Sequence, residues 1–190
     1  MERYLHTVGI IYKNQNNSPI LCHAGQTGSG KTFTMFGPDE ITCEEDKGIV
    51  PRASSHLFEM IRNDSREIQY SIKASFLEIY KENIRDLLQP SGQNLPVRES
   101  PTKGVYVEHL SEEYVSSEED ISDLIKQGET SRSVASTKMN SRSSRSHSLF
   151  IITVEQKNLA DDSVKIGKLN LIDLAGSEKV SHCWYYYLLC

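Results

Sequence analysis

The spacing of apolar and polar residues predicts an alternation of strands and helices. Residues 19–24 form a short apolar segment that runs into a glycine-rich turn. Residues 31–35 can continue from this turn as a helix, which Gly37 and Pro38 would end. Residues 67–80 then alternate between apolar and polar positions over a length that predicts one long strand. The first half of the chain therefore reads as strand, turn, helix and long strand.

Helical patterns occur in three other segments. Apolar residues recur at helical spacing in residues 49–62, where Pro51 is acceptable in a first turn. Residues 83–88 suit a short helix before a turn. Ser117, followed by three acidic residues, predicts the start of a longer helix that we expect to end at Gly128.

The remaining apolar segments are short and predict strands. Residues 95–97 and 105–107 suggest a small hairpin, and residues 149–154 and 169–174 suggest two further strands. Helices interleaved with strands, some of which are joined as hairpins, predict an α/β fold with a mixed central sheet flanked by helices.

Composition narrows the class of protein. The chain has 190 residues, 37% of them hydrophobic and 25% charged, which suits one folded domain and excludes overall disorder. Apolar runs are much shorter than the roughly 20 residues that cross a bilayer, so we expect no membrane partner. The formal net charge is −5, and no basic stripe interleaved with aromatics is present in the sequence, so we expect no nucleic-acid partner. Four cysteines without CxxC spacing suggest a reducing, cytoplasmic setting.

The glycine-rich turn fits the phosphate-binding pattern G-x-x-x-x-G-K-[ST]. Glycines let backbone N–H groups curl around phosphate oxygens, a lysine supplies a positive charge, and a threonine hydroxyl can bind Mg²⁺. A predicted strand precedes the turn and a predicted helix follows it, which is the context that this motif requires. The candidate nucleotide-binding residues are Gly25, Gln26, Thr27, Gly28, Ser29, Gly30, Lys31 and Thr32.

Two further segments carry candidate chemistry. The apolar strand at 169–174 contains Asp173 near its end, which suggests a carboxylate that holds Mg²⁺ beside the phosphate loop, or one that only caps a turn. Residues 140–147 are rich in serine and arginine, which offer ligands for Mg²⁺ and phosphate. By composition alone, a solvated loop or a phosphorylation segment is the favoured interpretation of 140–147.

These three segments, in this order, resemble the nucleotide site of a kinesin motor domain. GQTGSGKTFTM at 25–35 is similar to the phosphate loop of that family, NSRSSRSH at 140–147 to its first switch, and DLAGSE at 173–178 to its second. The resemblance extends from about residue 25 to residue 180 and looks closest to conventional kinesin heavy chains. It implies ATP and Mg²⁺ as ligands, and ATP hydrolysis coupled to movement along microtubules in the cytoplasm.

The resemblance also implies roles for individual residues. Thr32 and Ser144 would be direct Mg²⁺ ligands, and Asp173 would act on the ion through water. Ser143 would help to place the attacking water.

Three residues of the switches would respond to the γ-phosphate in that family. Gly176 would sense the phosphate, and Arg145 would pair with Glu178 as a latch that closes when ATP is bound.

The chain also departs from the family. We interpret residues 1–181 as a partial motor domain and residues 182–190 as a tail unlike the family. Most of the family's sequence before the loop is missing, and so are its later helices, including the main microtubule-binding helix, so we expect an incomplete sheet and a chain that does not walk. Ala24 stands where the family usually has an aromatic residue, which bears on selectivity for the base. The alternatives are a nucleotide-binding but non-motile product, or another P-loop NTPase. A small GTPase would need an Asn-Lys-x-Asp element, which the sequence lacks.

Overall fold

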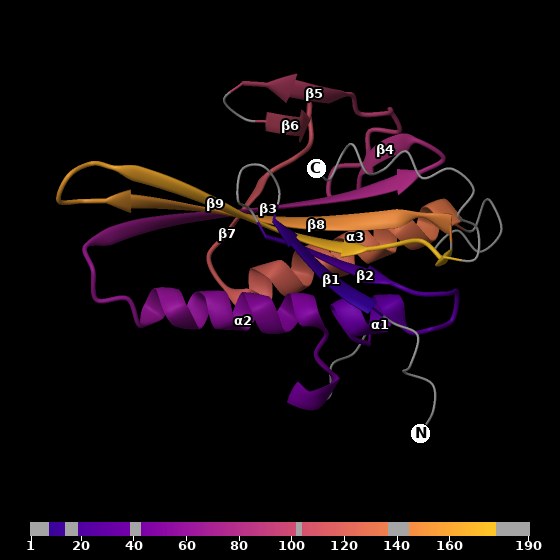
Figure 1. The fold of residues 1–190 in the computed structure, drawn as a ribbon, viewed down its shortest axis with the longest axis horizontal. Coiled ribbons are helices and arrows are strands. Elements are labelled where there is room, and N and C mark those ends of the chain that lie inside the picture. The colour runs from indigo at the N-terminus through magenta and orange to yellow at the C-terminus, as the bar shows by residue number, and fades with distance from the viewer. Residues whose placement is uncertain (1–7, 14–18, 39–42, 102–103, 137–144, 178–190) are drawn as a thin grey trace.

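A seven-stranded mixed sheet forms the centre of the molecule (Figure 1). The computed structural model describes residues 8–13, 19–38, 43–101, 104–136 and 145–177. Six strands follow the order β1-β2-β9-β8-β3-β4, and β7 also pairs with β3. Of the pairings between described strands, β2 with β9 is parallel and the others are antiparallel. The strands are β1 (Val8–Lys13), β2 (Pro19–Ala24), β3 (Ile68–Tyr80), β4 (Asn83–Asp86), β7 (Glu113–Val115), β8 (His147–Asn158) and β9 (Val164–Asp173).

Three helices pack against one face of this sheet. They are α1 (Lys31–Phe36), α2 (Ile49–Arg62) and α3 (Glu118–Ser136), and a short 3₁₀ helix, η1 (Glu44–Asp46), precedes α2. A separate hairpin of β5 (Val97–Ser100) and β6 (Gly104–Val107) lies over the other face (Figure 1). Within the described residues, no helix is both long and apolar enough to cross a membrane.

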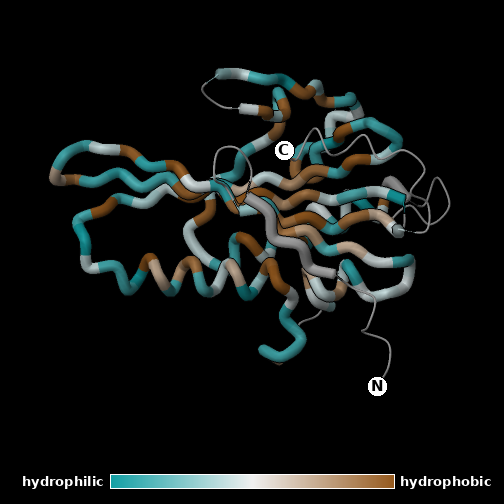
Figure 2. Tube along the Cα trace, viewed as in Figure 1, coloured by the Kyte–Doolittle hydropathy of each residue, from teal (hydrophilic) through white to brown (hydrophobic). Residues whose placement is uncertain are grey.

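The main core lies between the three helices and the sheet. Phe76 of β3 is fully buried at its centre, with its ring 5.6 Å from that of Phe36 and 5.3 Å from that of Phe150. The central strands are accordingly the most hydrophobic part of the trace in Figure 2. Aromatic pairs at these spacings add to the gain from burying apolar area.

Gly128 brings α3 unusually close to this core. A Cβ at residue 128 would lie 2.1 Å from Cδ1 of Phe76. The prediction that Gly128 ends the helix is therefore wrong, because α3 continues to Ser136 and the glycine serves packing instead. The predicted start is confirmed: the Asp120 N–H donates to Oγ of Ser117 at 3.2 Å, just before the helix begins.

The helix predicted over residues 83–88 is also wrong. Residues Asn83–Asp86 form β4, which pairs back onto the end of β3. Lys81 and Glu82 make the connecting turn with φ values of 49° and 63°, so both adopt the left-handed conformation of a tight two-residue hairpin. Glycine or asparagine is usual at such positions, and neither occurs here, so the turn was not visible in the sequence.

The other predicted elements are confirmed. The strands at 19–24 and 67–80 and the helices at 31–35 and 49–62 match β2, β3, α1 and α2. The small hairpin is present as β5–β6, but its first strand lies at Val97–Ser100 and shares only Val97 with the predicted 95–97. The last two predicted strands are present as β8 and β9 but extend further, as one long hairpin that projects beyond the sheet centre (Figure 1). The sequence pattern did not predict β1.

Candidate functional site

The glycine-rich loop joins the end of β2 to the start of α1. Gly28 and Gly30 have φ values of 78° and 86°, and a Cβ built on either would meet nothing within 4 Å. Glycine is therefore required at these two positions by backbone conformation rather than by lack of space. The Thr34 N–H donates to the Gly30 carbonyl at 2.8 Å, which starts the helix directly after the loop.

Lys31 closes the loop on itself. Its side chain is buried, and Nζ donates to the carbonyl of Gly25 at 2.9 Å and to that of Gln26 at 2.8 Å. The ammonium group therefore lies across the loop that its own residue ends. An ammonium group held among backbone groups at this place is suited to a polyphosphate.

Thr32 and Asp173 meet beside the loop. Oγ1 of Thr32 donates to Oδ2 of Asp173 at 2.6 Å. The contact forms because β2 and β9 are parallel neighbours, so that the loop after β2 and the end of β9 lie at the same edge of the sheet. The other carboxylate oxygen, Oδ1 of Asp173, is buried and has no hydrogen-bond partner among the described residues.

This pair fits a magnesium ion. Hydroxyl and carboxylate oxygens are the hard ligands that Mg²⁺ takes, and the unsatisfied Oδ1 of Asp173 can accept a hydrogen bond from water bound to the ion. The described residues contain no group of three or more His, Cys, Asp or Glu that could hold a metal. One hydroxyl and one carboxylate match an ion that keeps several waters and phosphate oxygens, as Mg²⁺ usually does.

The segment after β9 is tied to the loop and to β8. The Ala175 N–H donates to Nδ1 of His147 at 3.0 Å, and the Ser177 N–H donates to the Gly25 carbonyl at 3.1 Å. Gly176 lies between these two anchored residues. Its backbone is therefore held next to the phosphate loop, and its predicted role toward the γ-phosphate stays a prediction.

Arg132 of α3 is a site residue that the sequence did not reveal. Its buried guanidinium lies 3.7 Å from carboxylate oxygens of both Glu78 and Asp173, and it donates to Oγ of Ser146 at 3.2 Å. These contacts join α3 and β3 to the end of β9. One signal was available for Glu78: it continues the inward-facing positions of β3 after Phe76, where a charge needs a buried partner.

Two histidines flank Asp173. Burial lowers the pKa of His23 on β2, and the Lys31 charge lowers it further, while the Asp173 carboxylate opposes both effects. Burial likewise lowers the pKa of His147 on β8, with Arg132 acting in the same direction and Asp173 opposing. Both imidazoles therefore favour the neutral form at this site.

The predicted site residues are brought together only in part. Residues 25–32, Asp173 and Gly176 lie together at one edge of the sheet. Arg145 is exposed just before β8. Ser143, Ser144 and Glu178 lie outside the described residues, so the predicted Arg145–Glu178 latch and the serine roles stay predictions.

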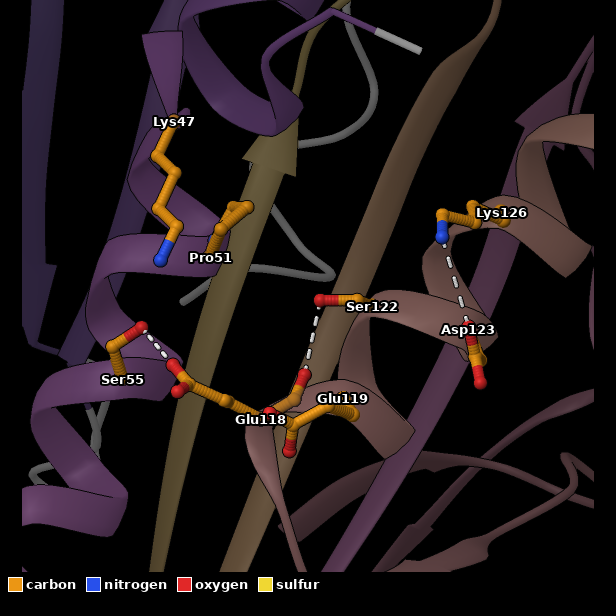
Figure 3. A pocket seen from close by; sticks show the side chains of 8 residues that line it. All are labelled: Lys47, Pro51, Ser55, Glu118, Glu119, Ser122, Asp123 and Lys126. Carbon is orange, nitrogen blue, oxygen red and sulfur yellow. Dashed lines mark hydrogen bonds and ion pairs between the residues drawn. The ribbon is translucent and has the colours of Figure 1, made fainter. Parts of the chain in front are cut away.

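A surface cleft of about 230 Å³ lies elsewhere, between α2 and α3 (Figure 3). Two of its three carboxylates already have partners: Ser55 donates to Glu118, and Lys126 lies 3.8 Å from Asp123. The cleft is lined by residues of the α2 and α3 regions and is therefore separate from the phosphate loop.

Comparison with known proteins agrees with this geometry. Residues 12–184 match the kinesin motor domain family. The chain is 54% identical over 158 residues to kinesin-related protein 3 of Dictyostelium discoideum, a match covering 83% of this chain and 13% of that protein. It is 51% identical over 156 residues to the kinesin heavy chain of Syncephalastrum racemosum, covering 82% of this chain and 17% of that protein.

A solved structure of a fast kinesin has the same fold. It superposes with a TM-score of 0.78 at 47% sequence identity, covering 83% of this chain and 44% of that one. The chain spans less than a fifth of the length of the curated relatives it matches. The resemblance expected from the three motifs is thus confirmed, and the chain belongs to the kinesin motor domain family.

Proposed function

We propose that this chain binds MgATP at residues 25–32 and forms part of a motor that couples ATP hydrolysis to movement along microtubules. One observation carries the nucleotide site: Lys31, Thr32 and Asp173 converge at one edge of the sheet, although Asp173 is far from the loop in sequence. Membership of the kinesin motor domain family supports ATP as the nucleotide.

Each residue of the loop has a defined task in this proposal. Backbone N–H groups of residues 25–30 bind phosphate oxygens, and Lys31 exchanges its contacts with Gly25 and Gln26 for the β- and γ-phosphates. Thr32 and Ser144 would hold Mg²⁺ directly, and Asp173 would hold water bound to the ion. When bound, the ion neutralises charge that develops on the transferring phosphoryl group.

The switch residues supply the response to the γ-phosphate. Gly176 turns its backbone N–H toward the phosphate, and Ser143 places the attacking water. Arg145 and Glu178 pair when ATP is bound. The anchoring of Ala175 and Ser177 on either side of Gly176 supports this part, because it keeps the glycine beside the loop.

Microtubules are the partner that family membership supports, and the cytoplasm is the corresponding location. The β5–β6 hairpin, with Arg98 and Lys103, would face the microtubule. Nε of Arg98 lies 3.0 Å from a carboxylate oxygen of Glu108, directly after β6, so the charge of Arg98 is already paired with an acidic side chain. The net charge of −5 gives no support for a nucleic-acid partner.

Two measurements on the purified chain test the proposal. Fluorescent ATP should bind with an affinity that falls when EDTA removes Mg²⁺, and unlabelled ATP should compete better than GTP. Phosphate release with and without microtubules then tests the motor assignment. Nucleotide binding without any stimulated release would support the non-motile alternative, and a preference for GTP would contradict the assignment to ATP.

A further inference from the structure

Four buried polar residues lie in one row across the sheet. Glu78 of β3 pairs with Ser148 of β8, Ser148 pairs with Asp173 of β9, and Asp173 pairs with His23 of β2. Residues paired in this way point to the same face of a sheet. None of the four is more than 5% exposed. The row therefore ends the apolar core on the side of the phosphate loop.

Three buried polar atoms of this row have unsatisfied hydrogen-bonding capacity. His23 Nδ1, Ser148 Oγ and Asp173 Oδ1 are buried and have no hydrogen-bond partner among the described residues. Buried polar atoms in native proteins almost always have a partner, whether protein, ordered water or ion. Three unsatisfied atoms in successive strands therefore indicate a polar species at this place.

The three atoms also share a chemical property, because each can accept a hydrogen bond. Asp173 accepts as a carboxylate, Ser148 as a hydroxyl, and His23 through Nδ1 when its proton is on Nε2. Water bound to a cation offers hydrogen-bond donors, so it is the complementary species.

The charges around the row agree with a cation. The carboxylates of Glu78, Asp173 and Glu129 lie 3.5–3.7 Å from the single guanidinium of Arg132. Lys31 faces the same region, and its ammonium is held by two carbonyls of the loop. Three carboxylates against these two cations still leave a net negative balance beside Thr32.

We infer that His23 is a positioning residue for the hydrated magnesium ion, accepting a hydrogen bond from the same shell of bound water that Asp173 holds. This inference rests on the proposed function, since it concerns the cation of that site. In this inference His23 acts on the ion through bound water, as Asp173 does, and is a positioning residue rather than a direct ligand.

Manganese with ADP provides a direct test. With ¹⁵N-histidine in the wild-type chain, pulsed electron paramagnetic resonance of the Mn²⁺–ADP complex should show weak nitrogen coupling from an imidazole outside the direct ligands. The coupling should disappear in His23→Asn and persist in His147→Asn, which removes the other nearby imidazole. This readout does not depend on turnover.

Affinity provides the second readout. His23→Ala should weaken Mn²⁺ binding in the presence of ADP about tenfold, the low end for loss of a residue that supports a metal. His23→Asn, whose carbonyl can replace Nδ1 as an acceptor, should recover most of the loss. Affinity for ADP in EDTA should not change. Cys22→Ala is the matched control, because Cys22 neighbours His23 but belongs to the core cluster on the opposite face.

The outcomes separate this inference from the proposed function. If the wild-type chain binds no nucleotide even with Mg²⁺, the proposed function fails and the inference fails with it. If the wild-type chain binds nucleotide in a Mg²⁺-dependent manner while His23→Ala retains wild-type Mn²⁺ affinity, the inference alone is overturned. Nitrogen coupling that is absent from the labelled wild-type complex overturns it without any variant.

Discussion

Thr32 and Asp173 are 141 residues apart in sequence, and their side chains meet in a hydrogen bond of 2.6 Å. The parallel pairing of β2 with β9 makes this contact possible, because both strands end at the same edge of the sheet. The contact links the first turn of α1, directly after the phosphate loop, to the end of β9. In the proposed function, a change in metal or phosphate at the loop would therefore act on the segment around Gly176.

Replacing the hydroxyl of Thr32 should uncouple the cation from the nucleotide. Thr32→Ala removes both the proposed oxygen ligand and the donor to Asp173, so ADP affinity with Mg²⁺ should fall at least tenfold. Thr32→Ser keeps the hydroxyl and should stay within a few-fold of wild type. Fluorescence anisotropy with labelled ADP, with and without EDTA, measures both. Equal Mg²⁺ dependence in Thr32→Ala and wild type would show that this hydroxyl does not bind the ion.

Removing the charge of Arg132 should destabilise the fold. Arg132→Met leaves the buried carboxylates of Glu78 and Asp173 without their cation, which costs about 3–5 kcal/mol of unfolding free energy when one partner of a buried ion pair is lost. Urea denaturation measures this. Arg62→Met, on the exposed end of α2, should cost at most about 1 kcal/mol. Similar stabilities for the two variants would contradict the role given to Arg132.

Gly128→Ala should also destabilise the fold, although alanine is the better helix former. The added methyl group would collide with Phe76 at 2.1 Å, and overpacking of this kind costs about 1–3 kcal/mol, against roughly 1 kcal/mol gained in helix propensity. Adding Phe76→Leu should reduce the cost of Gly128→Ala, because the smaller side chain makes room. A Gly128→Ala chain more stable than wild type in urea would disprove the close packing of α3.

The half-buried His147 should make stability depend on pH. Burial keeps the pKa of His147 below its ordinary value, so the unfolded chain takes up this proton first as the pH falls. The contribution of the neutral ring is complete above about pH 6.5 and is lost as the pH falls through the lower pKa of the folded state. Burial also lowers the pKa of His23, so this residue should likewise reduce the stability of the fold as the pH falls.

Thermal unfolding at pH 7.5 and pH 5.5 measures this dependence. His147→Asn keeps an acceptor for the Ala175 N–H but cannot take up the proton, so it should lose less stability than wild type between the two pH values. His56→Asn, at an exposed position on α2, should keep the wild-type loss. A loss in His147→Asn equal to that of wild type would rule out this contribution.

Local patterns were sufficient to predict most of the fold and the phosphate loop. The alternation in 67–80 and the glycines of 25–32 are read within one window of sequence, and both match the structure. The two errors have a common origin. The turn at Lys81 and Glu82 carries no glycine, and Gly128 has a partner, Phe76, in a distant strand. Neither feature leaves a local signal.

Sequence motifs identified the candidate site residues that belong to a motif. Residues that join the site only through tertiary contacts were missed. Asp173 was recognised because it ends an apolar strand. Arg132 and His23 carry no motif, and their importance follows from the register of β2 and β9 and from the approach of α3. Their contacts join residues separated by tens of positions, so the sequence alone could not pair them.

The central claim is that residues 25–32 bind a polyphosphate and that Lys31 neutralises its charge. The most direct test compares the affinity of the Lys31→Ala variant for ADP with that of the wild-type chain. Titration calorimetry should give an affinity at least tenfold below wild type in a chain whose circular dichroism shows it to be folded, since a lost charged hydrogen bond costs about 1.5–3 kcal/mol. Lys47→Ala, at the separate α2–α3 cleft, should bind as wild type does. A folded Lys31→Ala chain with wild-type affinity would contradict the account.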